Sequence, residues 1–64
     1  MYTPTIPCRV SCPADRGDPA YVGTATSVSE TIEHNHLGEP YRWVTVTHPN
    51  GRSTIWPSNR LSAA

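Results

Sequence analysis

The chain has 64 residues, and its five arginines balance five acidic residues, so the formal net charge is zero. Seven prolines and four glycines, with no apolar repeat at helical spacing, exclude long helices and favour an all-β domain. There is no basic run typical of a nucleic-acid binder, no apolar run near the ~20 residues of a membrane span, and no leader resembling a signal peptide, so we expect a cytoplasmic protein.

Residues 1–7 contain two prolines and do not alternate, which predicts an extended arm before a single domain of residues 8–64. We expect Tyr2 and Ile6 either to pack against the domain or a neighbouring subunit, or to fray with the arm. A domain of this size buries only ~60% of its unfolded-chain surface, so self-association is a plausible source of added stability.

Residues 8–12 alternate strictly, which predicts a first strand with Cys8, Val10 and Cys12 on one face. Four residues of strand separate the two thiols by about 13 Å, whereas a disulfide needs Cα atoms within ~7 Å. The pattern therefore predicts small buried free thiols, as in a reducing compartment, and neither an intrachain disulfide nor a shared metal.

Residues 13–19 read as a loop, because two prolines, a glycine and three charges leave nothing for a sheet to bury. Residues 21–32 are expected to form the longest strand. Within it, Gly23 predicts a bulge or a close backbone approach, and the apolar positions change parity between Ala25 and Val28. Either the strand bends at a bulge, or it breaks near Thr26.

Residues 33–40 read as a polar loop that carries His34 and His36. Structural zinc sites typically have three to five residues between their histidines, and these two have only one between them. We therefore expect exposed histidines and no metal or other cofactor.

Residues 43–47 and 53–56 are rich in β-branched and aromatic side chains, which predicts a hairpin around a turn at residues 48–51. Two registers are possible. A two-residue turn at Asn50 and Gly51 pairs Val46 with Ile55, whereas a type I turn with a left-handed glycine pairs Val46 with Thr54.

We favour the second register, because Pro49 suits the first central position of a type I turn. That register directs Val44, Val46 and Trp56 inward and Trp43 outward. Pro57 then ends the strand, and one turn of 3₁₀ helix over residues 57–60 is expected to return Leu61 to the core.

The run Ile55-Trp56-Pro57-Ser58-Asn59-Arg60-Leu61 resembles the end of eukaryotic SH3 domains, in which an apolar residue, Pro, Ser, Asn, Tyr and a small aliphatic residue follow one another. Trp43 stands about where SH3 domains carry the tryptophan of their peptide groove. With His48-Pro49, the same region also resembles plasmid-borne type II dihydrofolate reductases, which are SH3-like barrels. The resemblance implies a small five-stranded SH3-like barrel with a 3₁₀ turn before the last strand.

The SH3 resemblance implies a non-catalytic module that binds a protein or peptide partner and self-associates. In SH3 domains, acidic residues after the first strand select basic peptides, and Asp15 and Asp18 stand at the matching place. The alternative is a solvated turn in which one of these aspartates accepts hydrogen bonds from backbone amides. The implied contact residues are Tyr21, Tyr41, Trp43, Pro57, Asn59, Asp15 and Asp18.

Parts of the sequence also fit two other functions. The reductase motif Val-Gln-Ile-Tyr is matched by residues 53–56, but Thr54 replaces its glutamine and the chain has no lysine, so no catalytic residues are assigned and an enzyme is not expected. A nucleic-acid-binding barrel would use its arginines with Trp43 as a stacking platform, and zero net charge disfavours it. The arginines that such a nucleic-acid-binding barrel would use are Arg9, Arg42, Arg52 and Arg60.

Overall fold

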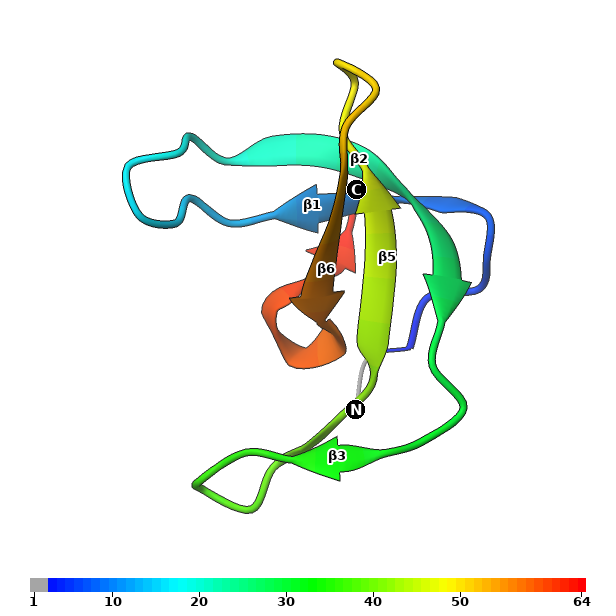
Figure 1. The fold of residues 1–64 in the computed structure, drawn as a ribbon, viewed down its shortest axis with the longest axis vertical. Coiled ribbons are helices and arrows are strands. Elements are labelled where there is room, and N and C mark those ends of the chain that lie inside the picture. The colour runs from blue at the N-terminus through cyan, green and yellow to red at the C-terminus, as the bar shows by residue number, and fades with distance from the viewer. Residues whose placement is uncertain (1–2) are drawn as a thin grey trace.

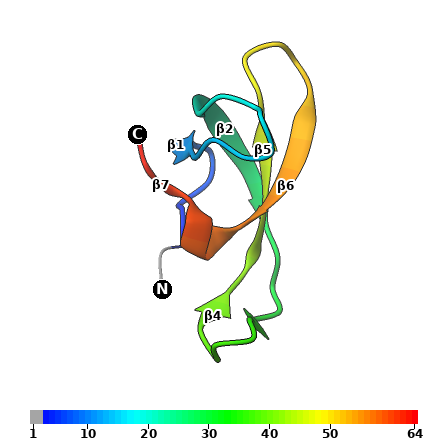
Figure 2. The same cartoon turned by 90° about the vertical axis from the view of Figure 1, so that its left-hand side faces the viewer.

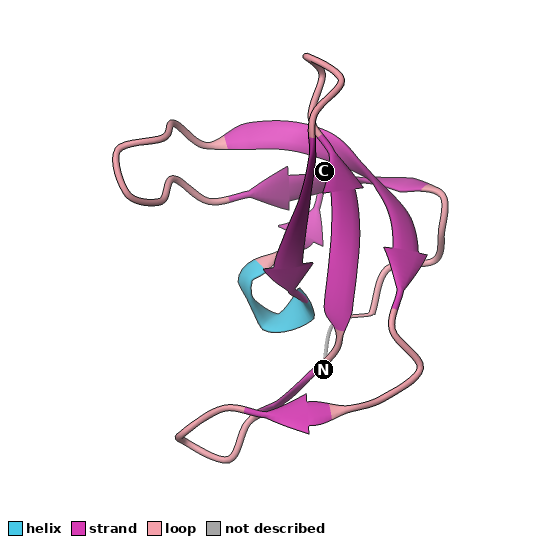
Figure 3. Ribbon diagram, viewed as in Figure 1, coloured by secondary structure: helices cyan, strands magenta, loops and turns pink. Residues whose placement is uncertain are grey.

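A computed structural model describes residues 3–64 and shows an all-β chain, as predicted (Figures 1 and 3). Five antiparallel strands form one sheet in the order β6-β5-β2-β1-β7, and two short strands form a separate hairpin. The elements are β1 (Cys8–Cys12), β2 (Tyr21–Val28), β3 (Glu33–His34), β4 (Pro40–Tyr41), β5 (Trp43–Thr47), β6 (Ser53–Pro57), the 3₁₀ turn η1 (Ser58–Arg60) and β7 (Ser62–Ala63).

The main sheet is not closed. Within residues 3–64, β6 pairs only with β5 and β7 pairs only with β1, so the sheet keeps two edges. The expected five strands and 3₁₀ turn are therefore present, whereas closure into a barrel is not. The same residues contain no helix with the length and apolar character needed to cross a bilayer.

Residues 3–7 of the N-terminal arm contain no strand or helix. Pro4 is buried and Ile6 is 43% exposed. Tyr2, which we expected to pack or fray with the arm, lies outside the described residues.

The alternation of β1 places its side chains as predicted. Val10 and Cys12 are fully buried, and the partly buried Cys8 packs against the same core. Both thiols are free. The whole strand pairs with the first half of β2, from Cys8 opposite Ala25 to Cys12 opposite Tyr21.

The loop between β1 and β2 ends in a tight turn from Asp15 to Asp18. Their backbones exchange two hydrogen bonds, of 3.1 and 2.8 Å, and the two central residues, Arg16 and Gly17, have φ of 48° and 85°. Positive φ at both central residues matches the twist of a hairpin. The predicted loop is thus the tip of the β1–β2 hairpin, and backbone hydrogen bonds close it. The carboxylates of Asp15 and Asp18 remain exposed at its surface.

The predicted bend of the second strand is present and has two causes. The register against β5 shifts between Ala25 and Ser27, which is the expected bulge. Gly23 permits a close approach, because a Cβ there would lie 2.5 Å from Cγ1 of Val46. As a result β2 curves strongly, and its first half pairs with β1 while its second half pairs with β5 (Figure 1).

The second strand ends at Val28, so its predicted extension to Ile32 is wrong. The hydroxyl of Ser29 donates to the carbonyl of Thr31 at 3.1 Å and accepts from the amide of Trp43 at 3.0 Å. These bonds turn the chain away from the sheet, and Ile32 is left 46% exposed.

Residues 33–41 form the β3–β4 hairpin, where a polar loop was predicted (Figure 2). Asn35 organises it, because its Oδ1 accepts from the amides of Leu37 and Glu39, both at 2.9 Å. Strands of two residues show no alternation, so the sequence pattern did not reveal them. His34 and His36 are exposed, as expected.

The β5–β6 hairpin adopts the predicted register, with Val46 opposite Thr54 and Val44 opposite Trp56. Gly51 has φ of 92°, the left-handed conformation that the turn requires. Trp56 is 9% exposed and Trp43 is 42% exposed, so the two tryptophans lie on opposite faces as predicted.

The core is small and lies under β1, β2, β5 and the end of β6. After η1 the chain returns to it through Leu61, which is 5% exposed, as predicted. The buried hydrophobic residues are Val10, Cys12, Ala25, Val44, Val46, Trp56 and Leu61.

Candidate binding site

The 3₁₀ turn η1 is fixed to the start of β5 by a reciprocal pair of hydrogen bonds. The amide of Ser58 donates to the carbonyl of Arg42 at 2.8 Å, and the amide of Arg42 donates to the hydroxyl of Ser58 at 3.0 Å. Ser58 is fully buried, so water does not compete for these bonds. This pair, called here the Ser58 clamp, holds η1 beside Tyr41 and Trp43.

Beside this clamp lies a first depression of about 220 Å³, the Trp43 hollow. Tyr41 and Trp43 meet edge to face, with ring centroids 5.2 Å apart and planes at 88°. Pro57, which pairs with Trp43 across the hairpin, forms part of the opposite wall. The structure thus brings together four residues expected to bind a partner, namely Tyr41, Trp43, Pro57 and Asn59.

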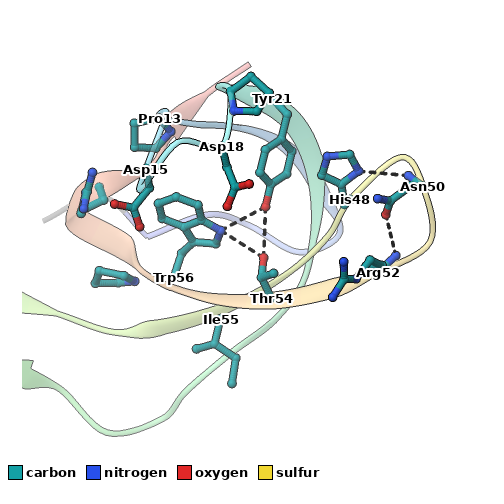
Figure 4. A pocket seen from close by; sticks show the side chains of 13 residues that line it. Pro13, Asp15, Asp18, Tyr21, His48, Asn50, Arg52, Thr54, Ile55 and Trp56 are labelled. Atoms are coloured by element: carbon teal, nitrogen blue, oxygen red, sulfur yellow. Dashed lines mark hydrogen bonds between the residues drawn. The ribbon is translucent and has the colours of Figure 1, made fainter.

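A second and larger depression of about 490 Å³, the Trp56 hollow, lies between the β1–β2 loop, the β5–β6 turn and η1 (Figure 4). Asp15, Asp18 and Tyr21, the remaining predicted contact residues, line it. In Figure 4 both carboxylates point toward the indole of Trp56, and neither takes part in a hydrogen bond among the residues drawn.

Three polar side chains form a closed triangle in the wall of the Trp56 hollow. The indole Nε1 of Trp56 donates toward the hydroxyls of Tyr21 and Thr54, at 3.1 Å each, and the two hydroxyls lie 3.0 Å apart. Sequence reasoning assigned Trp56 to the core alone and gave Thr54 no place in a binding site. Strand alternation already places Thr54 on the same face as Trp56, two residues away, whereas only the fold brings Tyr21 to both of them.

Pro57 and Arg60 line both hollows, so the two hollows adjoin at these residues. The guanidinium of Arg60 lies 5.7 Å from the centroid of the Trp56 ring. An arginine over an aromatic face is a favourable arrangement. Arg60, at the position where SH3 domains carry a tyrosine, therefore forms the boundary between the two hollows.

The other arginines are dispersed. Arg52 lines the Trp56 hollow, whereas the guanidinium of Arg42 donates to the carbonyls of Ser29 and Glu30 at 2.9 and 2.7 Å. Arg42 is thus used inside the domain, where it braces the chain after β2. It is not presented to a nucleic-acid backbone.

Cys12 lies behind Tyr21, and burial raises the pKa of its thiol above the ordinary value of 9.0, while a hydrogen bond with Tyr21 opposes part of that shift. A protonated, buried thiol is a poor nucleophile. Within residues 3–64, no three or more His, Cys, Asp or Glu side chains are placed to hold a metal ion together. The two hollows together present aromatic faces, hydroxyl groups, the carboxylates of Asp15 and Asp18, and the guanidinium groups of Arg52 and Arg60.

Comparison with known protein families, with curated proteins and with solved structures found no match for this chain.

Proposed function

We propose that the chain is a non-catalytic SH3-like interaction module, which binds an extended segment of a partner protein across the two hollows. The observation that carries this proposal is that the two hollows adjoin, since Pro57 and Arg60 line both. The antiparallel strand order with β1 between β2 and β7, and the 3₁₀ turn before β7, support the fold part of the proposal.

The Trp43 hollow suits an apolar residue of the partner, proline above all. Its walls are the perpendicular rings of Tyr41 and Trp43 together with the ring of Pro57. Aromatic grooves of this kind bind proline-containing segments, which lose little conformational entropy because they are already extended. A partner segment that inserts a proline ring here would cover the exposed part of Trp43.

The Trp56 hollow suits a basic side chain next to a backbone carbonyl. The carboxylates of Asp15 and Asp18 attract a cation to the hollow, where the guanidinium of Arg60 already lies 5.7 Å from the centroid of the Trp56 ring. The triangle holds three polar hydrogens, and the two hydroxyls use one of theirs between them. When Tyr21 donates to Thr54, the hydroxyl hydrogen of Thr54 remains to donate to a carbonyl of the partner.

Binding can be tested by titrating ¹⁵N-labelled protein with extended peptides that contain proline and arginine, and with the same peptides after Arg→Glu exchange. We expect the indole signals of both tryptophans to shift with the arginine peptides and to shift less with the glutamate peptides. Trp43→Ala should weaken binding at least tenfold while the thermal melt changes little, because the side chain is 42% exposed.

Leu37→Ala is the matched control, since Leu37 is 71% exposed at the tip of the β3–β4 hairpin and lines neither hollow. It should leave peptide affinity unchanged. Equal losses in the two variants, or peptides that shift neither indole signal, would contradict the proposal.

We also propose that the chain self-associates through the outward face of the β5–β6 hairpin. Ile55 is 66% exposed and shares the outward face of the β5–β6 hairpin with Trp43. β6 is also an edge of the sheet, and unpaired edges readily pair with other chains. A second copy of the chain that covered this face would shield both side chains and would compete with the partner segment for Trp43.

A further inference from the structure

Strand β6 is the longer of the two open edges of the main sheet. It has five residues and pairs only with β5, whereas β7 at the other edge has two residues. Proteins usually protect a sheet edge by keeping it very short or by placing charged side chains or proline on it. β6 is not short, carries no charged side chain, and has its one proline at the last position. It is therefore the edge that can accept another strand.

The hydrogen bonds at the two ends of the β5–β6 ladder show which backbone groups of β6 face the open edge. The amide of His48 donates to the carbonyl of Arg52 at 2.7 Å, and the amide of Ser58 donates to the carbonyl of Arg42 at 2.8 Å. Residue pairs of an antiparallel ladder alternate between hydrogen-bonded and non-hydrogen-bonded pairs. The even-numbered residues of β6 therefore bond to β5, and the odd-numbered residues direct their backbone groups to the open edge.

These outward backbone groups are the amides and carbonyls of Ser53 and Ile55 and the carbonyl of Pro57. None of them has a backbone partner within residues 3–64. Pro57 fits its position, because its nitrogen has no hydrogen to offer and points away from β5. The edge thus offers donors and acceptors about 7 Å apart, which is the spacing of alternate residues in a strand.

The Trp56 hollow borders this edge. Residues Thr54 to Pro57 all line it, although successive side chains of a strand point to opposite faces. In Figure 4 the side chain of Ile55 points away from those of Thr54 and Trp56. A hollow that reaches residues of both faces lies along the edge of the strand. A segment paired with β6 would therefore direct every second side chain into the Trp56 hollow.

A second copy of β6 would not fill the hollow in this way. In an edge-to-edge pair, the side chains that the second copy directs to this face are Thr54 and Trp56, which are already bonded to Tyr21 of their own chain. An extended segment of another protein has side chains that are free to enter.

The charges in the hollow indicate how such a segment would be recognised. The charged residues that line it are Asp15, Asp18, Arg52 and Arg60. Their charges balance, so attraction between net charges contributes little. Hydrogen bonds from the main chain of the segment are then the principal source of affinity, and a basic side chain placed near the two aspartates adds to it.

We infer that β6 binds the partner segment by strand addition, with the main chain of the segment bonded to the outward groups of Ser53, Ile55 and Pro57. In this mode main-chain bonds supply affinity and alternate side chains supply specificity. Beyond Pro57 the segment leaves the edge and reaches the Trp43 hollow, which adjoins there. The inference rests on the proposed function for the existence of the partner segment, and it specifies how that segment is held.

Amide hydrogen exchange of the free protein gives the first test. The amides of Ser53 and Ile55 should exchange fast and those of Thr54 and Trp56 slowly, because only the latter two bond to β5. Slow exchange of Ile55 in dilute protein would mean that the edge is covered, and it would overturn the inference. Protection that appears only as the protein concentration rises would place a second copy on the edge and would also overturn it.

The second test uses the arginine- and proline-containing peptides with one non-proline amide methylated at a time. A strand has a period of two residues, so methylation of every second amide should weaken binding about fivefold, and methylation of the amides between them should have little effect. A segment bound as a polyproline II helix has a period of three. Peptides that bind without a period of two would overturn the inference and leave the proposed function intact.

Ile55→Pro and Ile55→Ala form a matched pair for the third test. Ile55→Pro removes an outward donor without removing a bond to β5, whereas Ile55→Ala keeps that donor. Both variants should keep similar thermal melts, and Ile55→Pro should bind the peptides about fivefold more weakly than Ile55→Ala. Equal affinities would overturn the inference. If Ile55→Pro does not fold, the methylated peptides give the same test in the wild-type protein.

The outcomes separate the two proposals. If the wild type binds none of the peptides, the proposed function fails and strand addition fails with it. If the peptides bind while the amides of Ser53 and Ile55 stay unprotected in the complex, strand addition alone fails. Binding that slows the exchange of both amides, with a period of two in the methylation series, is the expected result.

Discussion

At the scale of single residues, the two tryptophans show how one hairpin assigns opposite roles to the same side chain. Trp56 faces inward opposite Val44, and Trp43 faces outward beside Tyr41. Because side chains alternate along a strand, the register alone decides which tryptophan supports the fold and which is available to a partner.

Trp56→Ala should lower the free energy of unfolding by about 3 to 5 kcal/mol, since it removes a large buried aromatic and leaves a cavity. Trp43→Ala should cost far less, because its ring is 42% exposed. Urea denaturation of both variants measures the contrast. A loss below about 1 kcal/mol for Trp56→Ala would be inconsistent with a tryptophan that is 9% exposed.

The thiol of Cys12 should make stability fall in alkaline solution. Burial raises its folded-state pKa above the ordinary 9.0, so folding favours the protonated form. The resulting contribution to the free energy of unfolding is fully present below pH 9.0. It is lost as the pH rises from there toward the folded pKa, because the thiol of the unfolded chain releases its proton first. Denaturant unfolding at about pH 8 and at about pH 10 measures this loss. The free energy of unfolding should decrease less between the two pH values in Cys12→Ala than in wild type.

Cys8→Ala is the control for this comparison, since Cys8 is only partly buried. It should retain the wild-type decrease. Native-state alkylation gives an independent measure, and Cys12 should react far more slowly than the same residue in denaturant.

At the scale of elements, the site depends on how the 3₁₀ turn is attached to β5. The Ser58 clamp joins residues 16 apart in the chain, and it places Pro57 and Arg60 between the two hollows. The hairpin alone does not define that position, because Pro57 ends β6 and the chain then changes direction.

Ser58→Ala should reduce stability by about 1 to 3 kcal/mol, because the amide of Arg42 loses its buried acceptor. It should also weaken peptide binding beyond this loss, since η1 is no longer held beside Trp43. Calorimetry and peptide titration measure the two effects separately. Ser62→Ala, the same change at an exposed position of β7, should affect neither stability nor peptide binding. Equal losses in Ser58→Ala and Ser62→Ala would refute a role for the Ser58 clamp.

At the scale of the whole molecule, the domain keeps an open edge and an exposed apolar face. Its buried core consists mostly of small side chains, with Trp56 and Leu61 as the larger members. A small core leaves little margin of stability, and covering Ile55 and Trp43 with a second copy would add to it.

Self-association through this face predicts that Ile55→Lys shifts the protein toward monomer in sedimentation experiments at a series of concentrations. A charge on the covered face would have to be desolvated, which opposes association. Leu37→Lys, at an exposed position on the β3–β4 hairpin, should leave the distribution unchanged. A wild type that is monomeric at all concentrations would remove this part of the proposal.

The sequence by itself determined the structural features that depend only on residues close together in the chain. Pro49 and Gly51 predicted the turn and hence the register, and strict alternation predicted the inward face of β1. Both follow from local rules of turn geometry and strand period, which need no knowledge of distant contacts. The SH3 resemblance also named candidate contact residues, among them Tyr41, Trp43 and Asp15, and each of these three lines one of the hollows.

Only the tertiary structure decided that these residues form two hollows, and which distant side chains complete them. Nε1 of Trp56 meets the hydroxyl of Tyr21 across 35 residues, and the bulge after Ala25 bends β2 so that such contacts are possible. The length of β2 and the β3–β4 hairpin were mispredicted for the same reason. Their ends depend on hydrogen bonds from Ser29 and Asn35 to residues whose positions the fold fixes, and no periodic pattern records those bonds.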